Sequence, residues 1–338
     1  MTRIPLALEG ATLPRGLQGN KHIEPLVIAD QGHFWVGVRR RVTDHGTVPM
    51  DHMFVQYQIP VDRRHPFPIV MVHGGGGQGL DFLATPDGRP GWATFFLRHG
   101  FCVYVVDRPG HGRARNGAAG VATTAPPTFE TLADVIFGNE SPMVQAPHTQ
   151  WPGARTVASE FADQFCAGQG SFAVDAAESE RSMQSAGAEL LDRIGAAILL
   201  THSMGAPLGW LVADARPGIV KAIVAIEPAG PPFGSLGPGL GVLKWGVTAS
   251  PLQLPNLRRL PVLVVTADAS PASRIDHATV DFLRQAGVAA EHLRLEEYGI
   301  RGNGHLMMLE RNSDEIAARL VDWLTRTLPP MSEAKSPA

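Results

Sequence analysis

Five short apolar runs, separated by helical patterns, constrain the fold of this chain more than any other feature of its sequence. Each run is four to eight residues long, which is the length of a buried strand. Helical patterns lie between the runs, for example at 92–99, 206–215 and 277–285. This alternation is typical of a mostly parallel sheet covered by helices on both faces, so we predict an α/β fold. The runs are 69–72, 103–106, 196–200, 219–226 and 262–265.

Two stretches ahead of these runs have a different pattern. Residues 33–38 and 53–59 alternate between apolar and polar side chains, which favours strands that are buried on one face only. We therefore predict two antiparallel strands at the start of the sheet. The basic run 39–41 is interpreted as a solvated strand end rather than a binding patch.

An unusually long separation interrupts the alternation. About 90 positions separate Val106 from Ala196, whereas a strand–helix–strand unit needs only about 30 residues. Apolar side chains in this interval favour an ordered lid that lines a pocket over a loose linker; they include Phe129, Ile136, Phe137, Met143 and Trp151. We predict a core formed by 1–115 and 195–328, a lid insertion with a return helix at 116–194, and a disordered tail at 329–338.

Bulk composition excludes several classes of partner. Hydrophobic residues make up 44% of the chain, charged residues 18%, and the formal net charge is −3, which predicts neither nucleic-acid nor membrane binding. A small molecule is the expected partner, and the oligomeric state is left open, a homodimer included. The first residues lack a secretory pattern, so we expect a cytoplasmic protein. The two cysteines, Cys102 and Cys166, are too few for a disulfide framework, although one disulfide is left open.

A serine follows the third apolar run at the junction with a helix. Thr201-His202-Ser203-Met204-Gly205-Ala206 has the strand-to-helix context of a nucleophile elbow, with small residues after the serine. Thr201 replaces the first glycine of the usual G-x-S-x-G pattern. The alternative interpretation is that Ser203 only caps the helix that follows.

A glycine-rich segment follows the first apolar run. In His73-Gly74-Gly75-Gly76-Gly77-Gln78-Gly79 the residues Gly74, Gly76 and Gly79 match G-x-G-x-x-G, and Asp107 ends the next strand, so a dinucleotide-dependent oxidoreductase is an alternative. The 28 positions between Gly79 and Asp107 exceed the roughly 20 expected for an acid that binds the ribose. This spacing argues against a dinucleotide site.

The His-Gly-Gly segment, the elbow serine and Asp107-Arg108-Pro109-Gly110-His111-Gly112 together resemble the α/β-hydrolases. The resemblance implies the α/β-hydrolase fold with Ser203 as nucleophile. It also implies an oxyanion hole formed by the backbone N–H groups of Gly75 and Met204, with Gly76 as the alternative to Gly75.

The same family implies a histidine base near the C-terminus, after the acid in chain order. Among the 13 histidines, His305 has this position, in a loop of small residues. Two carboxylates compete for the acid: Asp268 ends the last apolar run at the usual family position, and Glu227 ends the preceding one. The segments around Ser203, Glu227 and 302–312 resemble a bacterial esterase subfamily whose acid is a glutamate, which favours Glu227 over Asp268.

The resemblance implies a serine carboxylic-ester hydrolase, carboxylesterase-like, that acts through an acyl-enzyme and needs neither metal nor cofactor. Amidase and lactonase activities with the same triad are alternatives, as is a non-catalytic ligand-binding protein on this scaffold. Aromatic residues of the insertion suggest a small, apolar ester as substrate: Phe129, Phe137, Trp151 and Phe161.

Overall fold

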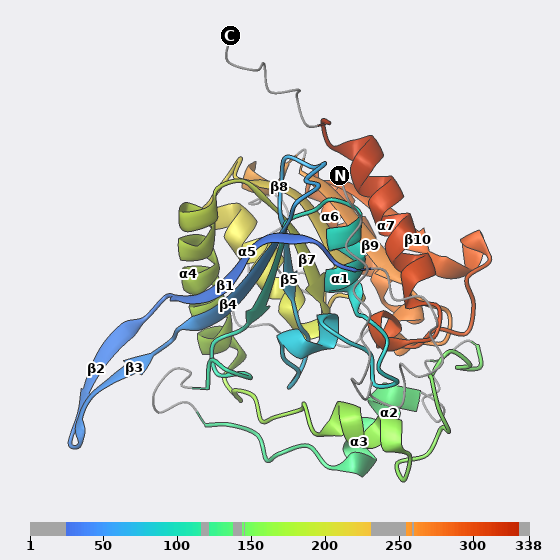
Figure 1. Cartoon of the computed structure of the whole chain (residues 1–338), viewed down its shortest axis with the longest axis horizontal. Coiled ribbons are helices and arrows are strands. Elements are labelled where there is room, and N and C mark those ends of the chain that lie inside the picture. Colours follow the sequence, from blue (N-terminus) through green and yellow to red (C-terminus); the bar gives the residue numbers. More distant parts are fainter. Residues whose placement is uncertain are drawn as a thin grey trace.

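The computed structural model describes residues 25–115, 122–137, 144, 146–230, 255–258 and 260–330. An eight-stranded sheet forms its centre, in the order β1-β4-β6-β5-β7-β8-β9-β10 (Figure 1). In chain order these strands are β1 (Ile28–Val36), β4 (Met53–Pro60), β5 (Ile69–Val72), β6 (Val103–Asp107), β7 (Ala197–His202), β8 (Val220–Ile226), β9 (Pro261–Thr266) and β10 (Ala289–Arg294).

Strand direction divides this sheet into two parts. The six strands from β6 to β10 in the sheet order run parallel, whereas β4 pairs antiparallel with both β6 and β1. The α/β prediction and the two antiparallel opening strands are therefore confirmed. All five apolar runs form strands, although Ala196 and Ile219 lie one residue ahead of β7 and β8, because each run is largely buried and is too short for a helix.

Side chains along each strand alternate between the two faces of the sheet, and a different set of helices covers each face. Along β5, Met71 packs on the face covered by α1 (Trp92–Arg98) and α7 (Ser313–Thr327). Val70 and Val72 pack on the opposite face, under three other helices. Those helices are α4 (Ala176–Ile194), α5 (Ala206–Ala215) and α6 (Asp276–Gln285).

The segment between β6 and β7 contributes two short helices in addition to α4. These are α2 (Phe129–Phe137) and α3 (Glu160–Cys166), which lie together at the bottom of Figure 1. Phe137 and Trp151 are buried and pack edge to face, with ring centroids 5.9 Å apart, in the same core cluster as α1 and α7. The division into core, lid and tail stays a prediction, and Met143 and residues 331–338 lie outside the described residues.

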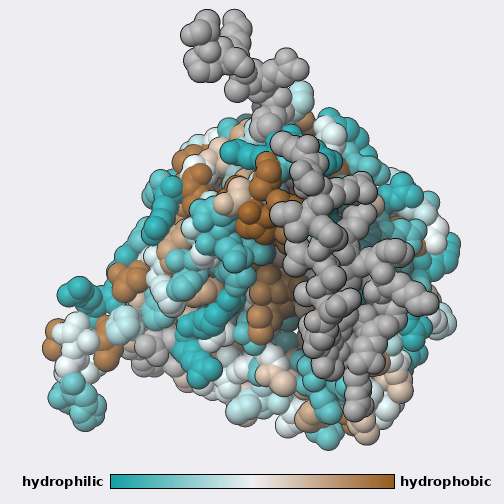
Figure 2. All heavy atoms as spheres, viewed as in Figure 1, coloured by the Kyte–Doolittle hydropathy of each residue, from teal (hydrophilic) through white to brown (hydrophobic). Residues whose placement is uncertain are grey.

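A two-stranded hairpin, absent from the prediction, extends from the sheet. It consists of β2 (Arg39–Thr43) and β3 (Gly46–Met50) and projects from the body of the molecule at the left of Figure 1. Hydrophilic and hydrophobic residues both cover its surface (Figure 2), and Val42 is 81% exposed. The basic run 39–41 forms the exposed first part of β2, as expected of a solvated strand end, and the chain reverses at residues 44–45, before β3.

The helices of the described ranges are all too short or too polar to span a membrane. Neither Cys102 nor Cys166 forms a disulfide; Cys102 is buried and Cys166 is partly buried.

Candidate active site

Ser203 lies at a sharp turn between β7 and α5. Its φ of 49° is in the left-handed region, which is strained for a residue with a side chain. The turn is tight: a Cβ atom at Gly205 would lie 2.4 Å from the carbonyl oxygen of His73. Only glycine therefore fits at 205, and the serine is held at the carboxyl edge of the parallel strands.

His305 reaches this edge from the loop after β10. Its Nε2 atom lies 2.9 Å from Oγ of Ser203, although 102 positions separate the two residues. The His305 side chain is 22% exposed, so the ring is partly accessible to solvent. The serine and histidine expected from the sequence are thus within hydrogen-bond distance of each other.

Glu227 lies on the other side of the histidine ring. Its Oε2 atom is 2.6 Å from Nδ1 of His305, and the carboxylate is fully buried. Oε1 accepts a hydrogen bond from the Ala267 N–H at 2.9 Å, and Oε2 accepts one from the Ser270 hydroxyl at 2.5 Å. Glu227 also has a positive φ, 41°. The sequence reasoning missed Ser270, which gave no signal apart from its position four residues after β9.

Asp268, the alternative acid, has different contacts. Its Oδ1 atom accepts a hydrogen bond from the Gly302 N–H at 2.9 Å, and Oδ2 lies 3.7 Å from Nη1 of Arg301. These contacts tie Asp268 to the start of the His305 loop. The structure therefore brings Glu227 to the imidazole and directs Asp268 to the backbone of the loop.

The glycine-rich loop after β5 runs beside the serine. At Gly74 a Cβ would lie 2.9 Å from Cβ of Ser203, so glycine allows this close approach. Gly75 has a φ of 28° and would direct a Cβ into open space, whereas a Cβ at Gly76 would lie 2.1 Å from the carbonyl oxygen of Gly170. Of the two predicted oxyanion donors in this loop, Gly75 thus borders the open side and Gly76 packs against the insertion.

Arg108, which the sequence reasoning did not single out, joins the two segments that would form an oxyanion hole. Its guanidinium donates to the carbonyl oxygens of Gly74 at 3.1 Å, Gly75 at 2.5 Å and Met204 at 3.2 Å. The residue is 2% exposed. Burial lowers the pKa of Arg108 to about 9, which leaves the side chain positively charged at neutral pH.

Three further histidines lie near Arg108, and all three are neutral at pH 7. Burial and the nearby charge of Arg108 lower the pKa of His111 to about 3, and burial holds the pKa values of His73 and His202 well below 6.5. His73 accepts from the Arg108 N–H at 3.1 Å, and Nε2 of His202 lies 2.9 Å from the His305 carbonyl oxygen. These hydrogen bonds join the segments around the site to one another.

Asp107, the carboxylate that would bind the ribose in a dinucleotide site, is already hydrogen-bonded within the protein. Asp107 accepts hydrogen bonds from the Gly79 N–H at 2.7 Å and from Nε of Arg113 at 2.7 Å. A Cβ at Gly79 would lie 2.9 Å from Oδ1 of Asp107, so this glycine is needed for packing within the protein. Because Asp107 is fully buried and hydrogen-bonded to protein groups, it does not reach a ribose, which argues against the dinucleotide-dependent oxidoreductase.

The model of the alpha/beta hydrolase fold family matches residues 68–246, which is more than half of the chain. The chain belongs to the α/β-hydrolase family. It is 37% identical over 313 residues to "Probable secreted lipase phiG" of a fungal species (strain ATCC 74256), covering 81% of this chain and 86% of that protein. A solved structure described as a novel bacterial esterase superposes with a TM-score of 0.72 at 26% identity, covering 90% of this chain and 98% of that one. The chain is thus an esterase- or lipase-type α/β-hydrolase.

A pocket of about 310 Å³ in this hydrolase lies beside Met204 and Arg108. Phe172 and Val174 of the insertion line it together with Met183 of α4 and Pro207 of α5. Phe137 and Trp151 are buried in the core and do not line this pocket, so a pocket-lining role for them stays a prediction. The remaining lining residues are Arg108, His111, Thr124, Ala173, Ala176, Ser179, Glu180 and Met204.

We expect Arg108→Met to impair both folding and activity of the hydrolase. The variant removes the guanidinium donor from the carbonyl oxygens of Gly75 and Met204, while the Gly74 carbonyl oxygen still accepts the Gly77 N–H, and the free energy of unfolding should fall by roughly 3 kcal/mol. Because the loops of Gly75 and Met204 lose their shared tie, kcat should fall by about 10²-fold. Urea unfolding and ester hydrolysis measure the two effects. Arg108→Lys is the control for charge, and an unchanged kcat in Arg108→Met would contradict the role.

Proposed function

We propose that this hydrolase is a serine carboxylic-ester hydrolase that acts through an acyl-enzyme, with Ser203, His305 and Glu227 as its triad. One observation carries the proposal: the chain of contacts from Ser203 Oγ to His305 Nε2 at 2.9 Å and from His305 Nδ1 to Glu227 at 2.6 Å. The base thus contacts the nucleophile on one side and an acid on the other, as nucleophilic catalysis requires.

In the first half-reaction, Oγ of Ser203 attacks the ester carbonyl carbon while His305 takes the hydroxyl proton. Glu227 accepts the Nδ1–H hydrogen bond and stabilises the imidazolium. The backbone N–H groups of Gly75 and Met204 bind the oxyanion of the tetrahedral intermediate. The intermediate collapses when the C–O bond to the alcohol breaks and His305 gives its proton to the departing alcohol oxygen.

In the second half-reaction, water attacks the acyl-enzyme as His305 accepts one of its protons. Collapse of the second tetrahedral intermediate breaks the bond to Ser203, and His305 returns the proton to the serine. The carboxylic acid leaves and the resting enzyme is restored.

The pocket beside Met204 supports an apolar group on the substrate. Its lining includes Phe172, Val174, Met183 and Pro207, which favour hydrocarbon over charged groups. Relatives named as a lipase and as an esterase support an ester over an amide or a lactone. We therefore propose a small ester with an apolar acyl group in this pocket.

The test combines covalent labelling with a substrate series. A fluorophosphonate should label the protein once, and peptide mass spectrometry should find the adduct on Ser203. Short- and medium-chain p-nitrophenyl esters should be hydrolysed faster than the matched anilides and lactones. An unlabelled protein that turns over none of these compounds would overturn the proposal, and faster anilide hydrolysis would favour the amidase.

Filling the pocket should change the acyl preference. We expect Ala173→Phe to lower kcat/KM for p-nitrophenyl hexanoate by about 10-fold relative to acetate, because the added ring excludes the longer chain. The control, Ala158→Phe, places the same ring at an exposed position of the insertion. Equal losses for both esters would show that the acyl chain does not enter this pocket.

A further inference from the structure

Another buried carboxylate, Glu310, holds the loop that carries His305. Its Oε1 atom accepts the Gly304 N–H at 2.8 Å, and its Oε2 atom accepts Nδ2 of Asn303 at 2.6 Å. Glu310 is fully buried. The side chain therefore bonds to the two residues that directly precede His305.

The other end of the same loop is bonded to the segment after β9. The Asn303 carbonyl oxygen accepts the Ala269 N–H at 3.1 Å, next to the Asp268 carboxylate that accepts the Gly302 N–H. Asn303 and Asn312 exchange two side-chain hydrogen bonds, at 2.6 and 3.1 Å. The backbone from 302 to 304 is thus held from both sides, with Glu310 at its His305 end.

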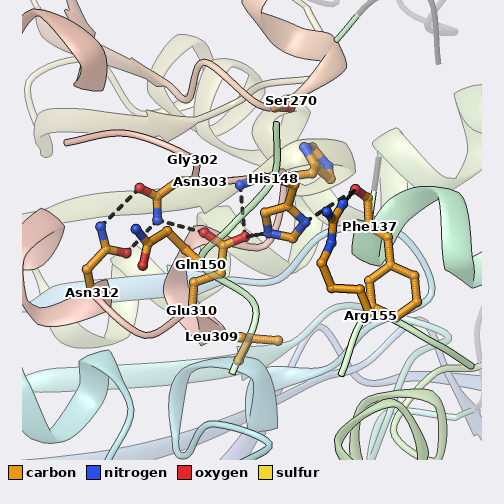
Figure 3. Close-up of polar contacts among 12 residues, drawn as sticks. Phe137, His148, Gln150, Arg155, Ser270, Gly302, Asn303, Leu309, Glu310 and Asn312 are labelled. Carbon is orange, nitrogen blue, oxygen red and sulfur yellow. Dashed lines mark hydrogen bonds and ion pairs between the residues drawn. The ribbon is translucent and has the colours of Figure 1, made fainter. Parts of the chain in front are cut away.

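A histidine from the insertion completes the surroundings of Glu310. Nε2 of His148 lies 2.6 Å from Oε1 of Glu310, and His148 is 1% exposed. Figure 3 shows Glu310 between Asn303 and the His148 ring, with Phe137 on the far side of that ring. Nδ1 of His148 lies 3.3 Å from the Phe137 carbonyl oxygen. The His148 ring thus lies between the Glu310 carboxylate and the Phe137 carbonyl oxygen, with one ring nitrogen facing each.

The two residues after His148 also contact the loop that carries His305. The N–H groups of Thr149 and Gln150 both donate to the Gly302 carbonyl oxygen, at 2.8 and 3.1 Å. A Cβ at Gly304 would lie 3.1 Å from Nε2 of His148 and 3.2 Å from Oε1 of Glu310. Glycine at 304 thus lets the His148–Glu310 pair approach the backbone beside His305.

We propose that His148 and Glu310 are positioning residues for the general base: the pair fixes the backbone at Gly304 and so aims the His305 ring at Ser203. The inference rests on the proposed function. His305 must keep its contacts with Ser203 and Glu227 at once, so a small shift of its backbone breaks one of them. Without Nε2 of His148, Oε1 of the buried Glu310 keeps only the Gly304 N–H, and the loop rearranges to let the carboxylate reach water or another donor.

The test compares three variants on a short-chain p-nitrophenyl ester. His148→Leu removes the side-chain donor to Glu310, and His148→Gln restores a side-chain N–H donor at this position. Gln150→Met is the matched control, since it removes the bond from Nε2 of Gln150 to the Arg301 carbonyl oxygen and leaves the Glu310 contacts in place. Thermal unfolding and circular dichroism show whether each variant is folded at the assay temperature.

We expect His148→Leu to lower kcat by about 10²-fold with KM changed by less than about two-fold, because the base is misplaced and the binding pocket is not. His148→Gln should recover most of this loss, and Gln150→Met should keep the wild-type kcat. A wild-type kcat in folded His148→Leu, or an equal loss in Gln150→Met, would overturn the inference.

Nitrogen-15 NMR of labelled histidines separates this inference from the proposed function. The His305 ring resonances, assigned with His305→Gln, should shift in His148→Leu and stay unchanged in Gln150→Met. An inactive wild type would overturn the proposed function, whereas unchanged His305 resonances in His148→Leu would overturn the positioning role.

Discussion

Replacing Ser203 with alanine is expected to lower kcat for a short-chain p-nitrophenyl ester by about 10⁶-fold, because no other group takes over the attack on the carbonyl. Residual hydrolysis would come from the oxyanion donors and from binding. The folded structure should persist, since the hydroxyl is small and the turn is set by the backbone around Gly205. Initial rates of the purified variant, together with its urea unfolding curve, measure both effects.

The same two measurements, of turnover and of unfolding, distinguish a nucleophilic Ser203 from a serine that only caps the helix. A cap serine replaced by alanine loses about 1 kcal/mol of stability and leaves activity intact. We expect the opposite pattern. A stable variant with wild-type turnover would remove Ser203 from the mechanism, and fluorophosphonate labelling of the variant would point to another nucleophile.

Glu227→Gln is expected to lower kcat by about 10⁴-fold, because an amide neither fixes the required tautomer of His305 nor stabilises its positive form. Asp268→Asn is the matched control: it changes the neighbouring carboxylate, and the amide oxygen can still accept the Gly302 N–H. We expect this variant to lose about 10-fold or less. Steady-state kinetics of the two variants side by side measure the difference, and a larger loss in Asp268→Asn would assign the acid to Asp268.

Much of the fold could be predicted because its signals are local. A run such as 69–72 is too short for a helix and too apolar for the surface, so its burial as a strand follows from the run itself. The hairpin β2–β3 was not predicted, because it lacks such a local burial signal. Its residues are largely exposed and its basic run resembles solvated surface, so no burial pattern marks it as a separate pair of strands.

The candidate site was predictable where a residue and its local context belong together. Ser203 stands between a strand and a helix with Gly205 behind it, and His305 stands in a loop of small residues after the last strand. The choice of the acid could not be predicted in this way, because Glu227 and Asp268 follow β8 and β9, which are neighbours in the sheet. Both carboxylates therefore lie near the same edge, and only side-chain direction distinguishes them.

The sequence by itself determined the parallel sheet and the turn that exposes Ser203, because short-range periodicity and small residues specify these features, and the resemblance to the α/β-hydrolases indicated His305 by its place in chain order. The tertiary structure alone decided which acid contacts the imidazole, that Arg108 ties three backbone carbonyls, and that His148 meets Glu310 across 162 positions. Contacts of this kind depend on distances between segments far apart in the chain, and such distances arise only when the whole sheet and its helices pack together.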